Sequence, residues 1–140
     1  MIRHIILRIV AKTLIPCILL FALYVQFHGD FGPGGGFQAG VIFAAGIILY
    51  ALMFGLHAAQ RVFPPRALEI LISLGVLLYG SVGLATIFLG GNFLDYSVLA
   101  HDPIHGQHLG IFLVELGVGI TVTAAMIKIF FLFVGRKRLL

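Results

Sequence analysis

Four long apolar stretches are the feature that most limits what this chain can become. They run over residues 5–27, 37–56, 67–89 and 109–134. Each is close to the roughly 20 residues that a helix needs to cross the hydrocarbon core of a bilayer. Of the 140 residues, 61% are hydrophobic and 10% are charged, whereas a soluble domain carries about 25% charged residues. We therefore predict an all-α integral membrane protein, a bundle of four transmembrane helices that forms one domain over residues 1–140.

The basic residues alternate between the two sides of the predicted membrane. Eight of the nine lysines and arginines lie in three places. These are the N-terminus (Arg3, Arg8, Lys12), the loop before residue 67 (Arg61, Arg66) and the C-terminus (Arg136, Lys137, Arg138). Because Lys and Arg concentrate in cytoplasmic loops, we expect both termini in the cytoplasm and a multi-pass protein of the cell membrane. The same scattering leaves no single basic patch for nucleic acid.

The stretch HGDFGPGGGFQAG, residues 28–40, separates the first two apolar runs. A phosphate-binding P-loop is excluded, because no lysine and hydroxyl residue follow the glycines. One interpretation is a tight turn in which Pro33 sets φ and the glycines accept positive φ. Three glycines exceed what a turn needs, so we expect backbone close to another segment, either for packing or beside a hydrated ion path. The residues assigned to this close-packing loop are Pro33, Gly34, Gly35, Gly36, Phe37 and Gly40.

Ionisable side chains inside the apolar runs are candidates for an ion path, since each costs about 2.5–3.5 kcal/mol at the bilayer centre. Glu115 should face the bundle, a partner subunit or water, as a proton-exchanging acid or as a packing carboxyl. Lys128 lies about 20 Å further along the same helix at 1.5 Å per residue, so the two cannot pair. Lys128 can reach the interface, where Glu69 and Lys12 can pair with each other or with it. The full set of ionisable candidates is Glu115, Lys128, Glu69, Lys12, Asp30 and His28.

The histidines do not predict a bound metal, and we expect no cofactor. His101, His105 and His108 follow one another at spacings of four and three residues. Pro103 and Gly106 are expected to interrupt any continuous helical face there, and no cysteine accompanies them. Histidines in a hydrated loop are therefore the preferred interpretation over a metal site. No two histidines lie inside the spans at matching depths, which argues against haem.

The glycine loop and the stretch GIFLVELGVGITV near the end resemble the B-type subunit of the Mrp (Mnh) multisubunit cation/proton antiporter. Related subunits occur in energy-converting membrane hydrogenases. The resemblance covers nearly the whole chain and is most specific where Pro33 to Phe37 open the second predicted helix. The chain departs from the family at Asp30, often His or Asn, at Ala39, often Gly, and at Glu115, often Asp.

The resemblance implies a complex of several different proteins that exchanges cytoplasmic Na+ for external protons. Within it, a small subunit of this kind would hold the assembly together or line an ion path between modules. Its partners would be the other subunits of the complex and the lipid bilayer.

A self-contained multidrug exporter, a homodimer of four-helix chains, is the alternative class. That class expects an acid in the first span, where this chain has a lysine and no acid. No residue set suggests an enzyme. For a subunit we expect small-residue helix faces against partners, such as Gly75, Gly80 and Gly83. The leading hypothesis places Glu115 below the glycine loop, with Gln38 bridging the two through water.

Overall fold

Within residues 2–29 and 31–136, which the computed structural model describes, the chain forms six helical segments. The long ones are α1 (Ile2–Phe27), α2 (Gly36–Phe54), α4 (Pro65–Phe88) and α5 (Pro103–Arg136). The short ones are α3 (Leu56–Val62) and the 3-10 turn η1 (Tyr96–Leu99). Each of the four long helices is long and apolar enough to cross a membrane, and the described residues contain no strand. The predicted all-α membrane fold is confirmed.

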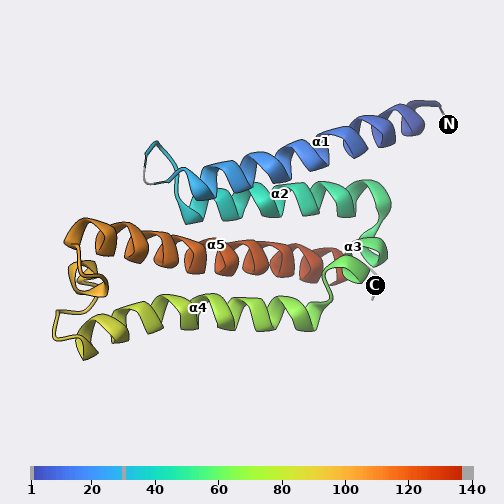
Figure 1. Ribbon diagram of the computed structural model, residues 1–140. Helices are drawn as coiled ribbons and strands as arrows, with labels where there is room; N and C mark the ends of the chain where they lie inside the picture. Colours follow the sequence, from blue (N-terminus) through green and yellow to red (C-terminus); the bar gives the residue numbers. More distant parts are fainter. Residues whose placement is uncertain (1, 30, 137–140) are drawn as a thin grey trace.

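The long helices lie side by side in the order α1, α2, α5, α4 (Figure 1). Helix α5 packs against α2 on one side and α4 on the other, and α1 packs on α2. The beginning of α1, the end of α5 and the whole of α3 lie at one end of this layer, the terminal end (Figure 1). The glycine loop and η1 lie at the opposite end, the loop end (Figure 1). The placement of the terminal end in the cytoplasm stays a prediction from charge.

Helix α5 begins at Pro103, ahead of the predicted start at residue 109. Proline suits the first helical position, because its missing N–H needs no partner there. Asp102 caps this end: its carboxylate accepts a hydrogen bond from the Ile104 N–H at 3.1 Å, and its carbonyl accepts one from the Gly106 N–H at 3.0 Å. The prediction that Pro103 and Gly106 interrupt a helical face is confirmed for Pro103, because the helix begins there and leaves His101 outside it, and was wrong for Gly106, which lies within the helix.

The short helix α3 was not predicted from the sequence. Helix α2 ends before it at Gly55, whose φ of +96° is a conformation that residues with a side chain rarely adopt. The chain then turns into α3, and its Leu56 and Ala59 are buried against the core. Pro65 at the first position of α4 starts the next span. The connection between the second and third spans is therefore packed structure and contributes to the core.

The segment between α4 and α5 folds back onto both helices at the loop end. Thr86 of α4 is fully buried, and its hydroxyl accepts a hydrogen bond from the Leu94 N–H at 3.0 Å. The ring of Tyr96 fills the space that a Cβ would need at Gly110 of α5. This segment thereby ties the loop end of α5 to α4 and fixes the helix that carries Glu115.

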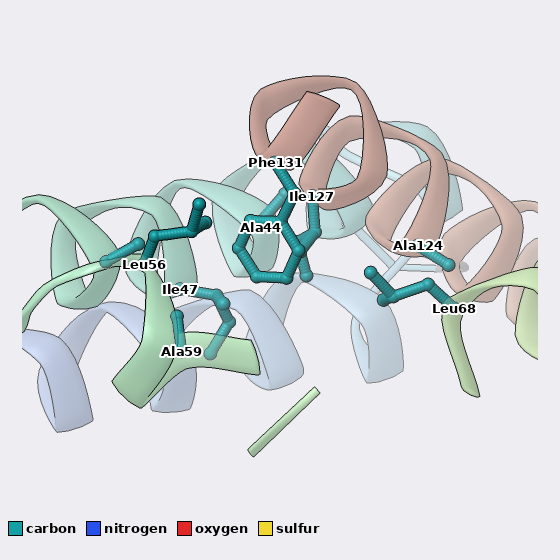
Figure 2. Close-up of a cluster of buried hydrophobic side chains, with 9 residues drawn as sticks. Ala44, Ile47, Leu56, Ala59, Leu68, Ala124, Ile127 and Phe131 are labelled. Atoms are coloured by element: carbon teal, nitrogen blue, oxygen red, sulfur yellow. The ribbon is translucent and has the colours of Figure 1, made fainter. Parts of the chain in front are cut away.

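A cluster of apolar side chains fills the terminal end, where α2, α3, α4 and α5 converge (Figure 2). Its members, the terminal cluster, are Ala44, Ile47, Ala51, Leu56, Ala59, Leu68, Ala124, Ile127 and Phe131. Leu68 and Ile127 are completely buried. Side-chain packing of this kind holds the helices together at this end of the molecule.

Large apolar side chains cover the outer faces of the long helices. Leu20, Leu77 and Phe133 are 68%, 65% and 71% exposed. Exposing such surface to water costs about 25 cal/mol per Å², so lipid or partner subunits cover it in the membrane. Cys17 of α1 is also exposed on this outer surface.

Candidate functional site

Two different physical causes explain why residues 34–36 of the loop are glycines. Gly34 has φ +128°, which residues with a side chain rarely adopt. Gly35 has φ −155°, extended backbone that any residue adopts, and Gly36 begins α2. The first glycine is therefore explained by its backbone conformation, whereas Gly35 and Gly36 must be explained by the atoms that leave no room for a side chain there.

Glu115 of α5 occupies the space beneath the loop. A Cβ added to Gly35 would lie 2.8 Å from Glu115 Oε1, and a Cβ added to Gly29 would overlap Oε2. A Cβ added to Gly36 would overlap the backbone carbonyl oxygen of Glu115 itself. The predicted close approach of loop backbone to another segment is confirmed, and that segment is α5 of the same chain.

The same contact continues one helical turn further from the loop. A Cβ added to Gly40 of α2 would lie 2.8 Å from the Gly119 carbonyl oxygen of α5, and one added to Gly119 would lie 3.3 Å from the Gly36 carbonyl oxygen. The Thr123 hydroxyl donates a hydrogen bond to the Gly40 carbonyl at 3.2 Å. The predicted small-xxx-small pair of α2 is therefore confirmed as the α2–α5 interface. Because the two backbones meet directly, the depth of Glu115 below the loop is fixed.

Aromatic and imidazole rings form a row across the loop end. His28 stacks on Tyr24 with ring centroids 5.0 Å apart. Phe31 lies 6.1 Å from His28 and 6.2 Å from His108, again between centroids. The row connects the end of α1 through the loop to α5. His108 precedes Glu115 by about two helical turns, which puts both on one face of α5.

The ionisable residues of the terminal end form a separate group. Lys128 Nζ lies 3.1 Å from Glu69 Oε1, and both side chains are partly exposed. Lys12 Nζ instead lies 6.0 Å from the centroid of the Phe54 ring. Of the pairings that the sequence left open, the structure forms Glu69 with Lys128. This pair lies far along α5 from Glu115 and does not belong to the same site.

The remaining histidines do not converge. His101, His105 and His108 are all exposed, and His105 Nε2 lies 3.9 Å from Asp102 Oδ2. Among the described residues, no group of three or more His, Cys, Asp or Glu side chains could hold a metal ion. Asp30, predicted as a further acid of the glycine loop, lies outside the described residues.

Two of the three α4 glycines expected to face partner subunits are covered within the chain. A Cβ added to Gly75 would lie 2.6 Å from the Gly117 carbonyl oxygen of α5, and the Phe93 ring covers Gly83. Gly80 has no atom within 4 Å of its added Cβ. The expectation was therefore wrong for Gly75 and Gly83, because Gly75 packs in the α4–α5 interface and Gly83 packs against the segment between α4 and α5. Gly80 remains available to a partner.

Gln26 of α1 is the polar residue that sequence reasoning missed. The residue expected to bridge the loop and Glu115, Gln38, is exposed on the surface. Gln26 is only 7% exposed, and its Oε1 lies where a Cβ of Gly119 would be. The buried residues of α1 follow a helical stripe: Ala11, Ile15, Ala22 and Gln26. The structure reveals this stripe within a run that is apolar on all sides, and it places Gln26 against α5 rather than lipid.

The fold and the site define a polytopic α-helical membrane protein in which the backbone of a glycine loop encloses one carboxylate. The model of the family described as "Domain related to MnhB subunit of Na+/H+ antiporter" matches residues 6–128. This chain belongs to that family.

Two staphylococcal relatives, each with the provisional name antiporter subunit mnhB2, illustrate the extent of the similarity. The protein of Staphylococcus haemolyticus (strain JCSC1435) is 33% identical over 138 residues, which are 96% of this chain and 97% of the relative. The protein of Staphylococcus aureus (strain Newman) is 33% identical over 130 residues, 91% and 92% of the two chains. The similarity therefore includes both the glycine loop and the part of α5 that carries Glu115.

Proposed function

We propose that this chain is an integral subunit of a multisubunit Na+/H+ antiporter of the cell membrane and that Glu115 is a proton-exchanging carboxyl of the complex. Membership of the MnhB family and the names of the relatives support the assignment to an antiporter. The observation that carries the role of Glu115 is the close approach of Gly29 and Gly35 to its carboxylate, with Gly36 against its backbone.

The enclosure suits a carboxyl that changes its protonation state. An ionised acid in an apolar medium costs several kcal/mol unless polar groups compensate it. Gly29 and Gly35 bring peptide groups, and no side chain of their own, next to the Glu115 carboxylate. The balance between its neutral and ionised forms then depends on nearby charge and water. Coupling of Na+ movement to proton movement requires such a balance.

The outer surface of the chain supports a place inside a larger assembly. Exposed apolar side chains extend along all four long helices, and a Cβ added to Gly80 of α4 would meet no atom within 4 Å. A homodimeric multidrug exporter is not favoured, because the described part of α1 contains no Asp or Glu. The proposed role is transport within a complex, and we propose no enzymatic reaction.

Co-purification tests membership of the complex. The chain is tagged in its native membrane, extracted in mild detergent, and the proteins that accompany it are identified by mass spectrometry. We expect several different hydrophobic antiporter subunits at fixed ratios to it. Recovery of a stable homodimer alone would contradict the assignment and favour the exporter class.

Conservative neutralisation of the acid tests the role of Glu115. Glu115→Gln keeps the shape of the side chain and removes its proton exchange, so Na+-driven proton movement in everted vesicles should fall at least about tenfold with assembly unchanged. Glu69→Gln is the matched control, because Glu69 is an exposed acid of the terminal end. Exchange at the wild-type rate in Glu115→Gln would overturn the carboxyl's role.

A further inference from the structure

Gln26 presents a buried polar group that the protein leaves unpaired. Its side chain is more than nine-tenths buried, and its amide nitrogen Nε2 makes no hydrogen bond within the described residues. Buried polar atoms nearly always have a partner in the protein or in ordered water, and an unpaired one in an apolar interior is costly. Something that accepts a hydrogen bond is therefore expected beside Gln26.

The Gln26 side chain borders a partly open cavity of about 220 Å³ between α1, α2, α4 and α5. Residues that line it include Gln26, Gly40, Phe43, Leu71, Gly119 and Thr123. A water molecule in the liquid occupies about 30 Å³, so several waters fit. The amide of Gln26 and the hydroxyl of Thr123 lie in this lining, and the hydroxyl can still accept hydrogen bonds while it donates to Gly40. The cavity thus has room for water, and Gln26 and Thr123 are the polar side chains in a lining that is otherwise apolar.

The cavity adjoins the turn of α5 that follows Glu115, and Glu115 itself is not among its lining residues. Glu115, Gly119 and Thr123 follow at intervals of four residues and share one face of α5. Gly119 therefore lies about 6 Å and Thr123 about 12 Å along the helix from Glu115, at 1.5 Å per residue. Because Gly119 has no side chain, Gln26 reaches across to α5 at this level. On the far side, Leu71 of α4 and Phe63 extend the lining toward the terminal end.

We propose that this cavity is a water-binding site, anchored by Gln26 and Thr123, that brings solvent to the inner side of the glycine-loop carboxylate. The role toward Glu115 rests on the function proposed above, whereas the binding of water rests on Gln26 and the cavity alone. Proton exchange by a carboxyl in a membrane needs contact with water of this kind.

Thiol labelling in the purified complex tests the water site. Thr123→Cys places a thiol in the cavity, and Cys17 on the outer face of α1 is the built-in reference. Because only the thiolate reacts and thiols ionise in water, a small charged methanethiosulfonate should modify residue 123 at least about tenfold faster than Cys17. Equal or slower modification at residue 123 would overturn the proposal, including the case in which a partner's side chain fills the cavity.

Addition of Gln26→Leu to the Thr123→Cys variant should slow modification at residue 123 several-fold. An unchanged rate would contradict the anchoring role of Gln26.

Hydroxyl-radical footprinting of the wild-type complex needs no variant and covers the case in which Thr123→Cys fails to assemble. Radicals form from bound water, so Phe43 in the cavity should be oxidised faster than Phe21, an exposed ring further inside a span on the outer face of α1. Oxidation of Phe43 no faster than that of Phe21 would overturn the water site. A wet cavity combined with normal exchange in Glu115→Gln would support the water site and overturn only the carboxyl's role.

Discussion

The two ends of this helical layer are held together in different ways. At the loop end, α2 meets α5 through backbone, with Gly36 and Gly40 against Glu115 and Gly119. At the terminal end, the same two helices meet through the side chains of the terminal cluster, including Ile127 (Figure 2). The loop end encloses a carboxylate and a buried amide, whereas the terminal cluster is apolar throughout.

The difference follows from what each end has to accommodate. Apolar side chains gain little from leaving lipid, so helices in a membrane associate through close packing and polar contacts. Direct backbone contact leaves no side chain between the helices and holds a polar group at a fixed depth. Packed side chains fill space more adaptably, but they offer no partner to a carboxylate. We therefore expect the loop end to tolerate substitution poorly and the terminal end to lose stability in proportion to the volume removed.

The largest expected effect is at Gly36. Gly36→Val would drive a branched side chain into the Glu115 backbone and separate α2 from α5. Because backbone cannot move aside as a side chain can, the cost should exceed the usual 1–3 kcal/mol of overpacking. We predict loss of folded protein from the membrane, measured by immunoblot and by size-exclusion chromatography in detergent. Gly80→Val is the control, because a Cβ there meets no atom within 4 Å; equal loss in both variants would contradict the account.

A smaller effect is expected from a cavity at the terminal end. Ile127→Ala removes a completely buried side chain from the terminal cluster, which should lower the free energy of unfolding by about 2–5 kcal/mol. Thermal unfolding of the detergent-solubilised chain measures the change. Leu132→Ala on the same helix is the control, since Leu132 is 64% exposed. If both variants unfold alike, the terminal cluster does not stabilise this end.

The smallest expected effect is on thermal stability at alkaline pH. It concerns Tyr96, which lies in the segment between α4 and α5 at the loop end. Burial, followed by the nearby Tyr79, raises the pKa of Tyr96 above its ordinary value of 10.0. The folded chain therefore favours the neutral phenol, so this contribution to stability is complete below pH 10 and is lost as the pH rises through the higher folded value. Thermal stability of Tyr96→Phe should fall less steeply above pH 10 than that of the wild type. Identical pH profiles would show that Tyr96 does not contribute.

Sequence patterns identified what depends on local composition. The four spans followed from the length of the apolar runs, and the excess of glycines at residues 34–36 indicated a close backbone approach. The segment approached by the loop is separated from it by about eighty residues, so only the fold could identify Glu115 on α5 as that neighbour. The start of α5 was placed too late because the apolar run begins only at Leu109, whereas the helix includes the polar residues before it and starts at Pro103, a residue favoured at a first helical position.

The buried amide was missed for a related reason. Gln26 is a single polar residue in an apolar run, and its inward direction depends on its phase relative to Ala22 and the other buried residues of α1. Gln38 is nearer to the loop in sequence, but it is exposed. Sequence distance from the loop was therefore a poorer guide than helical phase.

A double-mutant cycle tests the central claim, that Gly35 is glycine because the Glu115 carboxylate lies against it. Gly35→Ala puts a Cβ 2.8 Å from Oε1, whereas Gly36→Ala puts one into the Glu115 backbone carbonyl. Each is measured by thermal unfolding, alone and combined with Glu115→Ala. We predict that Glu115→Ala relieves the cost of Gly35→Ala by about 1 kcal/mol or more, and leaves the cost of Gly36→Ala unchanged. An equal cost of Gly35→Ala with and without the Glu115 side chain would contradict the enclosed-carboxylate site.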